Sequence, residues 1–105
     1  MKRLRIVLAD DNGAFLQKLT SLLGAEFEVV ETAVDGKSAL EAIRRCKPDL
    51  AVLDLAMPML NGIEVTKELA KSLQNPPIVI CSVESDPEII EAARSAGASA
   101  ELKTI

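Results

Sequence analysis

Aromatic side chains are almost absent from this sequence. Its 105 residues include two phenylalanines and no tryptophan or tyrosine, whereas 49% of the chain is hydrophobic. A core must therefore be built from isoleucine, leucine, valine and alanine, a composition that suits helices packed on a buried parallel sheet. The length provides for one domain with one core and is too short for two.

The chain also lacks any excess of basic residues. Twelve lysines and arginines stand against 16 aspartates and glutamates, which gives a formal net charge of −4. This balance argues against direct binding of nucleic acid, because nucleic-acid-binding domains usually present a basic face. No run of like charges indicates a charged tail.

Cysteine is rare, and Cys46 and Cys81 both stand in apolar surroundings outside any CxxC pair. We expect two free, buried thiols in a reducing compartment rather than a disulfide or metal ligands. Long apolar runs are missing as well. The run Ile6–Ala9 after the basic N-terminus is too short for a signal sequence, and no segment is long enough to cross a bilayer. The sequence therefore predicts a cytoplasmic location.

What the sequence does contain is a regular alternation of two kinds of segment. Short apolar or β-branched runs predict strands, and apolar residues at helical spacing predict helices between them. The predicted strands cover residues 5–9, 27–33, 50–53, 78–81 and 99–102. The four predicted helices run from Asn12 or Asp11 to Gly24, from Asp35-Gly36 to Pro48, from Asn61 (with Glu64 completing a capping box) to Asn75-Pro76-Pro77, and from Asp86-Pro87 to Gly97. This alternation predicts an α/β fold with a parallel sheet, helices on both faces and right-handed crossovers.

The stretch from Pro48 to Gly62 organises the rest of the chain. Its apolar run, Leu50–Leu53, predicts a buried strand that ends at a lone carboxylate, Asp54. An irregular connection containing Pro58 follows, and then a helix. The sequence therefore delivers one acid to the carboxyl end of a strand, where an open α/β sheet has its binding crevice.

Other polar residues follow the ends of other predicted strands. Asp10 and Asp11 follow the first strand, Ser82 the fourth and Lys103 the fifth. Taken alone, each has an ordinary interpretation as a helix cap, a turn former or a polar surface residue. Together with Asp54 they would meet at one edge of the sheet, and this shared position favours a functional site.

This arrangement resembles the receiver domain of two-component response regulators, over almost the whole chain. The segment Asp54–Gly62 is similar to the phosphorylation-site loop of that family, and Val7–Asp11 to its acidic pair. Ile78–Ser82 is similar to the strand that ends in a Ser or Thr switch residue, and Ala96–Ala98 to the turn before the last strand. The loop most resembles transcription regulators with a helix-turn-helix output domain, although no such domain is present.

The resemblance implies a flavodoxin-like, doubly wound fold of three layers with strand order 2-1-3-4-5. It implies a phosphorelay function, in which a histidine kinase or phosphotransfer protein phosphorylates Asp54 in a Mg²⁺-dependent reaction and so switches a partner or output domain. Such a domain is not an enzyme beyond its own phosphorylation and dephosphorylation. The family binds neither membrane nor nucleic acid through this domain.

The resemblance also assigns the metal ligands. Asp11 and Asp54 would bind Mg²⁺ directly, Asp10 directly or through water, and the backbone carbonyl of Ala56 would be a further ligand. The physical chemistry agrees, because three converging carboxylates repel one another and a hard cation with oxygen ligands relieves that repulsion.

Two more roles are implied for residues at the strand ends. Lys103 would offset charge on the phosphoryl oxygens, and Ser82 would donate a hydrogen bond to one of them and draw its loop inward. However, Lys103 follows Gly97 one residue earlier than the family pattern requires, and Thr104 occupies the expected lysine position. Lys103 reaches the site only if the Ser99-Ala100 loop absorbs the difference.

Two further departures concern the end of the chain. Glu101 or Ala100 stands where the family has an aromatic switch residue, so no ring can swing inward behind Ser82. The helix after the fifth strand is missing, so residues 1–105 would form a receiver domain without its last helix. Part of the sheet face near the first and third strands would be apolar and bare, which predicts a truncated chain, a disordered remainder or a homodimer across this face.

Three alternatives stay open at this point. A haloacid-dehalogenase-like phosphatase would need a second acid where Ala56 stands, and a flavodoxin-like nucleotide or flavin site would need a phosphate loop where Asp10 and Asp11 stand. A degenerate receiver that acts only as a protein-interaction or dimerisation module would account for the altered fifth strand.

Overall fold

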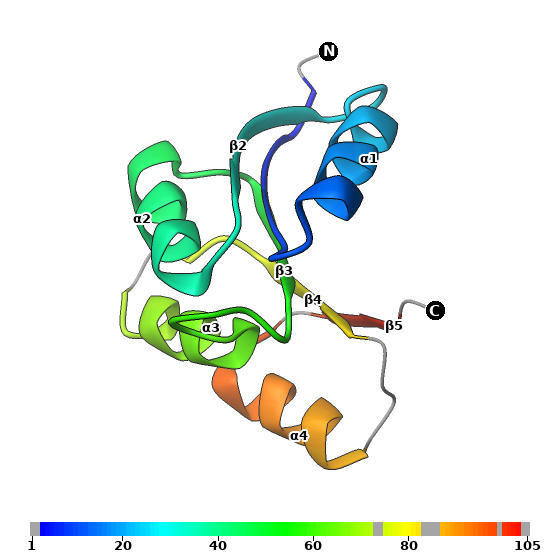
Figure 1. Ribbon diagram of the computed structural model, residues 1–105. Helices are drawn as coiled ribbons and strands as arrows, with labels where there is room; N and C mark the ends of the chain where they lie inside the picture. The colour runs from blue at the N-terminus through cyan, green and yellow to red at the C-terminus, as the bar shows by residue number, and fades with distance from the viewer. Residues whose placement is uncertain (1–2, 73–74, 83–86, 99, 104–105) are drawn as a thin grey trace.

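A five-stranded parallel sheet in the order β2-β1-β3-β4-β5 forms the centre of the computed structural model (Figure 1), which describes residues 3–72, 75–82, 87–98 and 100–103. Its strands are β1 (Arg5–Ala9), β2 (Glu28–Ala33), β3 (Leu50–Asp54), β4 (Ile78–Ser82) and β5 (Ala100–Lys103). Four helices alternate with them: α1 (Gly13–Leu23), α2 (Gly36–Cys46), α3 (Gly62–Ala70) and α4 (Pro87–Ala96). The predicted flavodoxin-like fold and strand order are confirmed.

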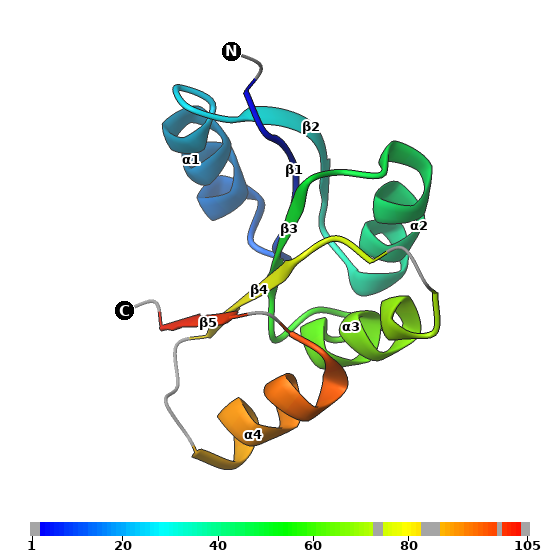
Figure 2. The ribbon, with the colours of Figure 1, turned by 180° about the vertical axis from the view of Figure 1, so that it is seen from behind.

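The helices are divided unequally between the two faces of the sheet. Figures 1 and 2 show α1 on one side and α2, α3 and α4 on the other. α1 packs against β1 and β2, α2 against the same two strands from the opposite side, α3 against β4, and α4 against β5. These layers leave the carboxyl ends of all five strands at one edge.

Local capping explains where the helices begin. The Asn12 side chain accepts a hydrogen bond from the Phe15 N–H at 3.1 Å, and Asp35 accepts one from the Ser38 N–H at 2.7 Å. Asn61 and Glu64 exchange hydrogen bonds of 2.8 and 2.9 Å between side chain and backbone, the capping box that the sequence predicts. Each cap satisfies donors that an isolated helix end leaves unpaired.

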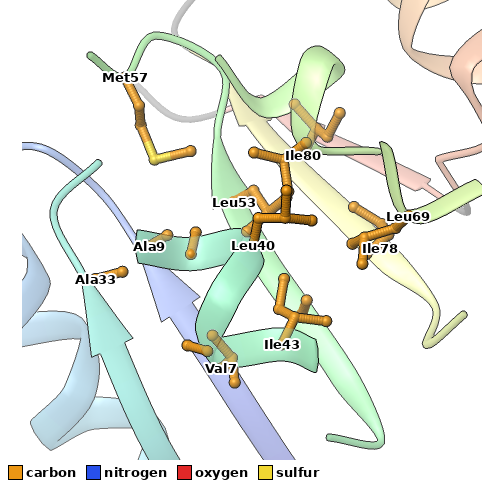
Figure 3. Close-up of a cluster of buried hydrophobic side chains, with 14 residues drawn as sticks. Val7, Ala9, Ala33, Leu40, Ile43, Leu53, Met57, Leu69, Ile78 and Ile80 are labelled. Carbon is orange, nitrogen blue, oxygen red and sulfur yellow. The ribbon is translucent and has the colours of Figure 1, made fainter. Parts of the chain in front are cut away.

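The larger core lies between the sheet and the helices α2 and α3, and it is aliphatic as the composition predicts. Val7, Leu53 and Ile80, from three neighbouring strands, are each fully buried. Figure 3 shows Leu40 and Ile43 of α2 directed toward them, with Met57 reaching into the same cluster from the connection after β3. Burial at this density fixes β3, and with it the acid at its end.

Some predicted boundaries are wrong by one residue. β5 extends to Lys103 rather than ending at Leu102, β2 begins at Glu28 rather than at Phe27, and β3 extends to include Asp54. These are strand ends, where the apolar pattern is weakest and the sheet register decides the limit. Ser99, the predicted first residue of the fifth strand, lies outside the described residues. Leu73, which the sequence placed on the third helix, and the predicted cap Asp86 lie outside the described residues.

The sheet face that carries α1 is covered only in part. Ile6 and Leu8 of β1 are buried beneath α1, whereas Leu50 and Val52 of β3 and Val79 of β4 are half-buried. The exposed part therefore lies over β3 and β4, and the prediction that it would extend to β1 is wrong, because α1 shields that strand. Among the described residues, no helix combines the length and hydropathy needed to cross a membrane.

Candidate functional site

Three carboxylates converge at the carboxyl edge of the sheet. Ala9 pairs with Leu53 in the parallel ladder between β1 and β3, so the residues that follow, Asp10 and Asp54, emerge side by side. One carboxylate oxygen from each of Asp10, Asp11 and Asp54 lies within 4.8 Å of the others. The structure thus brings together the three acids that the sequence predicts to share an ion.

The backbone around Asp10 holds the first acid in place. Its N–H donates to the carbonyl of Ala33 at 3.0 Å, which ties the end of β1 to the end of β2. Its carboxylate accepts a hydrogen bond of 2.8 Å from the Asn12 N–H, and Asn12 in turn caps α1. Asp11 follows directly and is exposed, so it presents its carboxylate to solvent.

Burial, together with the crowding of like charges, makes ionisation of Asp10 and Asp54 difficult. Burial raises the pKa of Asp54 to about 6, and repulsion from Asp10 and Asp11 adds to the rise, while a hydrogen bond from the Ala56 N–H opposes it. Burial also raises the pKa of Asp10, with a smaller contribution from Asp11. At neutral pH the site therefore holds negative charge against an electrostatic penalty, which a bound cation would relieve.

The strand register shows where the backbones of Ser82 and Lys103, the two remaining candidate residues, lie. Asp54 pairs with Cys81, and the next residue along β4, Ser82, pairs with Lys103 at the end of β5. The backbones of Ser82 and Lys103 therefore lie next to one another at the edge that carries the acids. Thr104, the alternative lysine position, lies outside the described residues. The roles of Ser82 and Lys103 remain predictions.

The connection after Asp54 contains a feature that sequence reasoning missed. Met59 has φ 73°, and the Leu60 N–H donates to the Pro58 carbonyl at 2.9 Å, so residues 58–60 form a tight turn with a left-handed residue at its centre. Such a turn is strained for a residue other than glycine. The sequence holds no signal for it, because methionine is not a typical turn residue.

Cys81 was expected to be an ordinary buried thiol, yet it lies beside the acids. Burial raises the pKa of this thiol, and the charges of Asp54 and Asp10 raise it further. The sulfur is therefore kept protonated, as a small apolar side chain behind the site. Cys46 is also free.

The donor set suits a hard divalent cation. Every side chain in the cluster offers carboxylate oxygen, and Mg²⁺ prefers oxygen ligands, often one or two carboxylates with waters completing its shell. The exposed Ala56 follows two residues after Asp54, within the same connection. The electrostatic penalty within the cluster is itself a reason for a cation to bind there.

Replacing Asp54→Asn is expected to stabilise the metal-free protein at pH 7. Folding raises the pKa of this carboxyl from its usual 3.8 to about 6, so the cost of ionising it is complete above pH 6 and disappears below pH 4. After discounting for solvent screening of this half-exposed group, the expected gain at pH 7 is about 1 kcal/mol. Urea unfolding in EDTA at pH 7 and pH 4 measures it.

The matched control is Asp49→Asn, at the opposite edge of the sheet, where the residue accepts a hydrogen bond from the Arg5 N–H and an asparagine oxygen can do the same. A stabilisation by Asp54→Asn that is equal at both pH values would contradict the electrostatic explanation.

Comparison with known proteins agrees with this geometry. The family model described as the response regulator receiver domain matches residues 6–103. The transcriptional regulatory protein PdtaR of Mycobacterium tuberculosis is 37% identical over 99 residues, which cover 93% of this chain and 48% of PdtaR. The chemotaxis protein CheY of Thermotoga maritima is 33% identical over 96 residues, 90% of this chain and 79% of CheY.

Solved structures give the same result. The signal receiver domain of NarL from Mycobacterium tuberculosis superposes with a TM-score of 0.94 and 30% identity, covering 98% of this chain and 85% of that domain. The chain spans much less of some curated relatives, including 23% of a protein-glutamate methylesterase/protein-glutamine glutaminase of Vibrio vulnificus that is 32% identical over 85 residues. The acid cluster, the strand order and these matches lead to one conclusion: the chain belongs to the receiver-domain family of two-component response regulators.

Proposed function

We propose that this domain is a phosphorylation switch in which Asp54 accepts a phosphoryl group from a histidine kinase or a phosphotransfer protein. The observation that carries the proposal is the convergence of three carboxylates within 4.8 Å at the carboxyl edge of the sheet. Asp54 is the last residue of β3, the central strand of the sheet, which lies between β1 and β4. Asp10 and Asp11 follow the end of β1 instead. This position favours Asp54 as the nucleophile.

Mg²⁺ is the proposed cofactor. Asp11 and Asp54 would hold it directly, Asp10 directly or through water, and the carbonyl of Ala56 would complete the protein ligands. When bound, the ion neutralises the carboxylates and offsets charge on the transferred phosphoryl oxygens. Without the cation, the raised pKa of Asp54 would leave part of the nucleophile protonated near pH 6.

The proposed phosphoryl transfer to Asp54 forms one bond and breaks one. A carboxylate oxygen of Asp54 forms a bond to phosphorus while the bond between phosphorus and the imidazole nitrogen of the donor breaks, and that nitrogen keeps the electron pair. Water later attacks the acyl phosphate, releasing inorganic phosphate and restoring the carboxylate. The domain would thus act on no substrate other than its own aspartate.

Ser82 and Lys103 are the proposed readers of the phosphoryl group. Their backbones pair across β4 and β5 at the site edge. Lys103 would place positive charge near the phosphoryl oxygens, and the Ser82 hydroxyl would donate a hydrogen bond to one of them. New contacts of this kind would draw the carboxyl end of β4 inward and so bias a partner surface toward one of two states.

The rim of the site supports docking of a protein donor. Three large apolar side chains remain exposed there: Phe15 at the first turn of α1, Val34 after β2, and Met59 after β3, which are 39%, 51% and 71% exposed. Apolar side chains that folding leaves in water around a reactive centre are typical of an interaction surface. We propose that the donor covers this rim while its histidine reaches Asp54.

We also infer a cytoplasmic location. The free thiols of Cys46 and Cys81 suit a reducing compartment. The output of the switch follows from the partner, and the relatives include transcription regulators and a chemotaxis protein.

Incubation with acetyl phosphate and Mg²⁺ is expected to add one phosphoryl group, about 80 Da, to the intact chain by the transfer chemistry proposed above. EDTA should abolish the addition, because the nucleophile then loses its charge-neutralising cation. Intact-mass spectrometry detects the product, and hydroxylamine should remove it as expected of an acyl phosphate.

Asp54→Asn should remain unmodified, whereas the control Asp49→Asn should be modified like the natural chain. Modification of Asp54→Asn to the same extent would refute the assignment, and no modification of the natural chain would favour a purely scaffolding receiver.

Lys103→Ala is expected to slow phosphorylation by acetyl phosphate by about tenfold or more, because a positive charge facing the phosphoryl oxygens is lost. Thr104→Ala is the matched control, since Thr104 occupies the position that the family pattern gives to lysine. Initial rates of mass increase measure both. Equal rates for Lys103→Ala and the natural chain would mean that Lys103 does not reach the site.

A second role, homodimerisation, is favoured by the incompletely covered sheet face. Leu50, Val52 and Val79 are half-buried there, on the side of the sheet that carries α1. We propose that a second copy of residues 1–105 packs on this apolar strip. Sedimentation velocity should show a dimer that Val52→Lys converts to a monomer without loss of secondary structure. A monomeric natural chain that binds no hydrophobic dye would rule out this role.

A further inference from the structure

Gly36, the first residue of α2, lies directly against the connection between β3 and α3. The Gly36 N–H donates to the Pro58 carbonyl at 3.1 Å. A β-carbon added at Gly36 would lie 1.8 Å from the Leu60 carbonyl oxygen and 2.5 Å from its carbonyl carbon. No side chain other than hydrogen fits at this contact without moving one of the two segments, since backbone atoms cannot rotate away.

The connection that Gly36 touches is the strained one. Met59 holds φ 73° at the centre of the tight turn, and its side chain is 71% exposed. Burial of Met59 therefore does not compensate for the strain. A strained conformation persists only where its surroundings hold it, and such conformations gather at functional sites. The contact from Gly36 is one restraint that holds it.

The connection between β3 and α3 is held in place on both sides of Ala56, which lies two residues after the nucleophile Asp54. At its far end the Gly62 N–H donates to the Leu55 carbonyl at 2.9 Å, and a β-carbon on Gly62 would lie 2.6 Å from the Asp54 carbonyl oxygen. In the middle, Met57 is buried in the core. At the tip, the Pro58 carbonyl accepts two hydrogen bonds, from Leu60 and from Gly36. Ala56 lies between these fixed points.

We propose that Gly36 is a positioning residue for the phospho-acceptor site, and that the start of α2 acts as a brace for the connection that carries Ala56. The brace holds the Ala56 carbonyl and N–H in place beside Asp54 before the cation binds. This inference rests on the proposed function for the identity of the ligand. The inference adds Gly36 to the residues that support the site, although Gly36 itself would touch neither the cation nor the phosphoryl group.

Thermodynamic linkage makes the proposal testable in the natural chain. If the brace favours cation binding, cation binding must strengthen the brace by the same free energy. Hydrogen exchange at the Gly36 N–H is therefore expected to slow by about fivefold or more on addition of saturating Mg²⁺. The Lys47 N–H, bonded to the Ile43 carbonyl at 3.0 Å at the other end of α2, is the internal control and should not change. Equal slowing at both amides would reflect general stabilisation and would overturn the brace, as would no slowing at Gly36.

The variant Gly36→Ala provides a second, independent test. Gly36→Ala is expected to lower Mg²⁺ affinity by about tenfold, as supporting contacts around metal ligands commonly do, measured from the Asp11 amide shift during titration with Mg²⁺. Gly13→Ala is the matched control, because a β-carbon there meets no atom within 4 Å, and Ile43→Val controls for a modest loss of stability in the α2 core. Both controls should keep the natural affinity.

The outcomes separate the two proposals. No Mg²⁺-dependent shift in the natural chain would refute the proposed function itself. Normal Mg²⁺ binding by the natural chain, with unchanged affinity in a folded Gly36→Ala, would refute the brace alone. If Gly36→Ala does not fold, hydrogen exchange in the natural chain still decides.

Discussion

The partial burial of mutually repelling carboxylates is the constraint that shapes the candidate site. β1 and β3 are adjacent and parallel, so the acids that follow them emerge together, and their oxygens lie within 4.8 Å. The aliphatic core behind the strands leaves no freedom to separate them. Folding thus keeps like charges close together at the sheet edge. Their oxygens are suitable ligands for a cation. The pKa of Asp54 is raised to about 6, and the surface around the acids stays accessible to a phosphoryl donor.

Much of this could be read from the sequence. The alternation of apolar runs and helical spacing predicts every strand and helix that the structure describes, and the capping residues Asn12 and Asn61 mark helix starts correctly. The acids were found because parallel strands expose their carboxyl ends at one edge, a property of topology rather than of local conformation. Asp10, Asp11 and Asp54 therefore needed only the correct fold class to be grouped.

Contacts between segments distant in the sequence could not be predicted. The bond from Gly36 to the Pro58 carbonyl joins residues whose closeness depends on how two loops meet, and Met59 is held at φ 73° by that environment rather than by its own preference. The predicted extent of the uncovered face is also wrong, because the strands that α1 covers are determined by tertiary packing. The end of β5 was wrong by one residue, since a four-residue strand offers little periodicity from which to judge its limits.

The unequal anchoring of the helices has its own consequence for dynamics. Both α1 and α2 pack against β1 and β2, but α2 buries five residues, whereas Leu16 is the sole buried residue of α1. Free energies of local opening follow such differences, so α1 is expected to open locally more readily than α2. Its N-terminal cap, Asn12, also holds the carboxylate of Asp10. Local opening of α1 would therefore also release the carboxylate of Asp10, so the lifetime of the assembled acid cluster depends on how firmly α1 is packed.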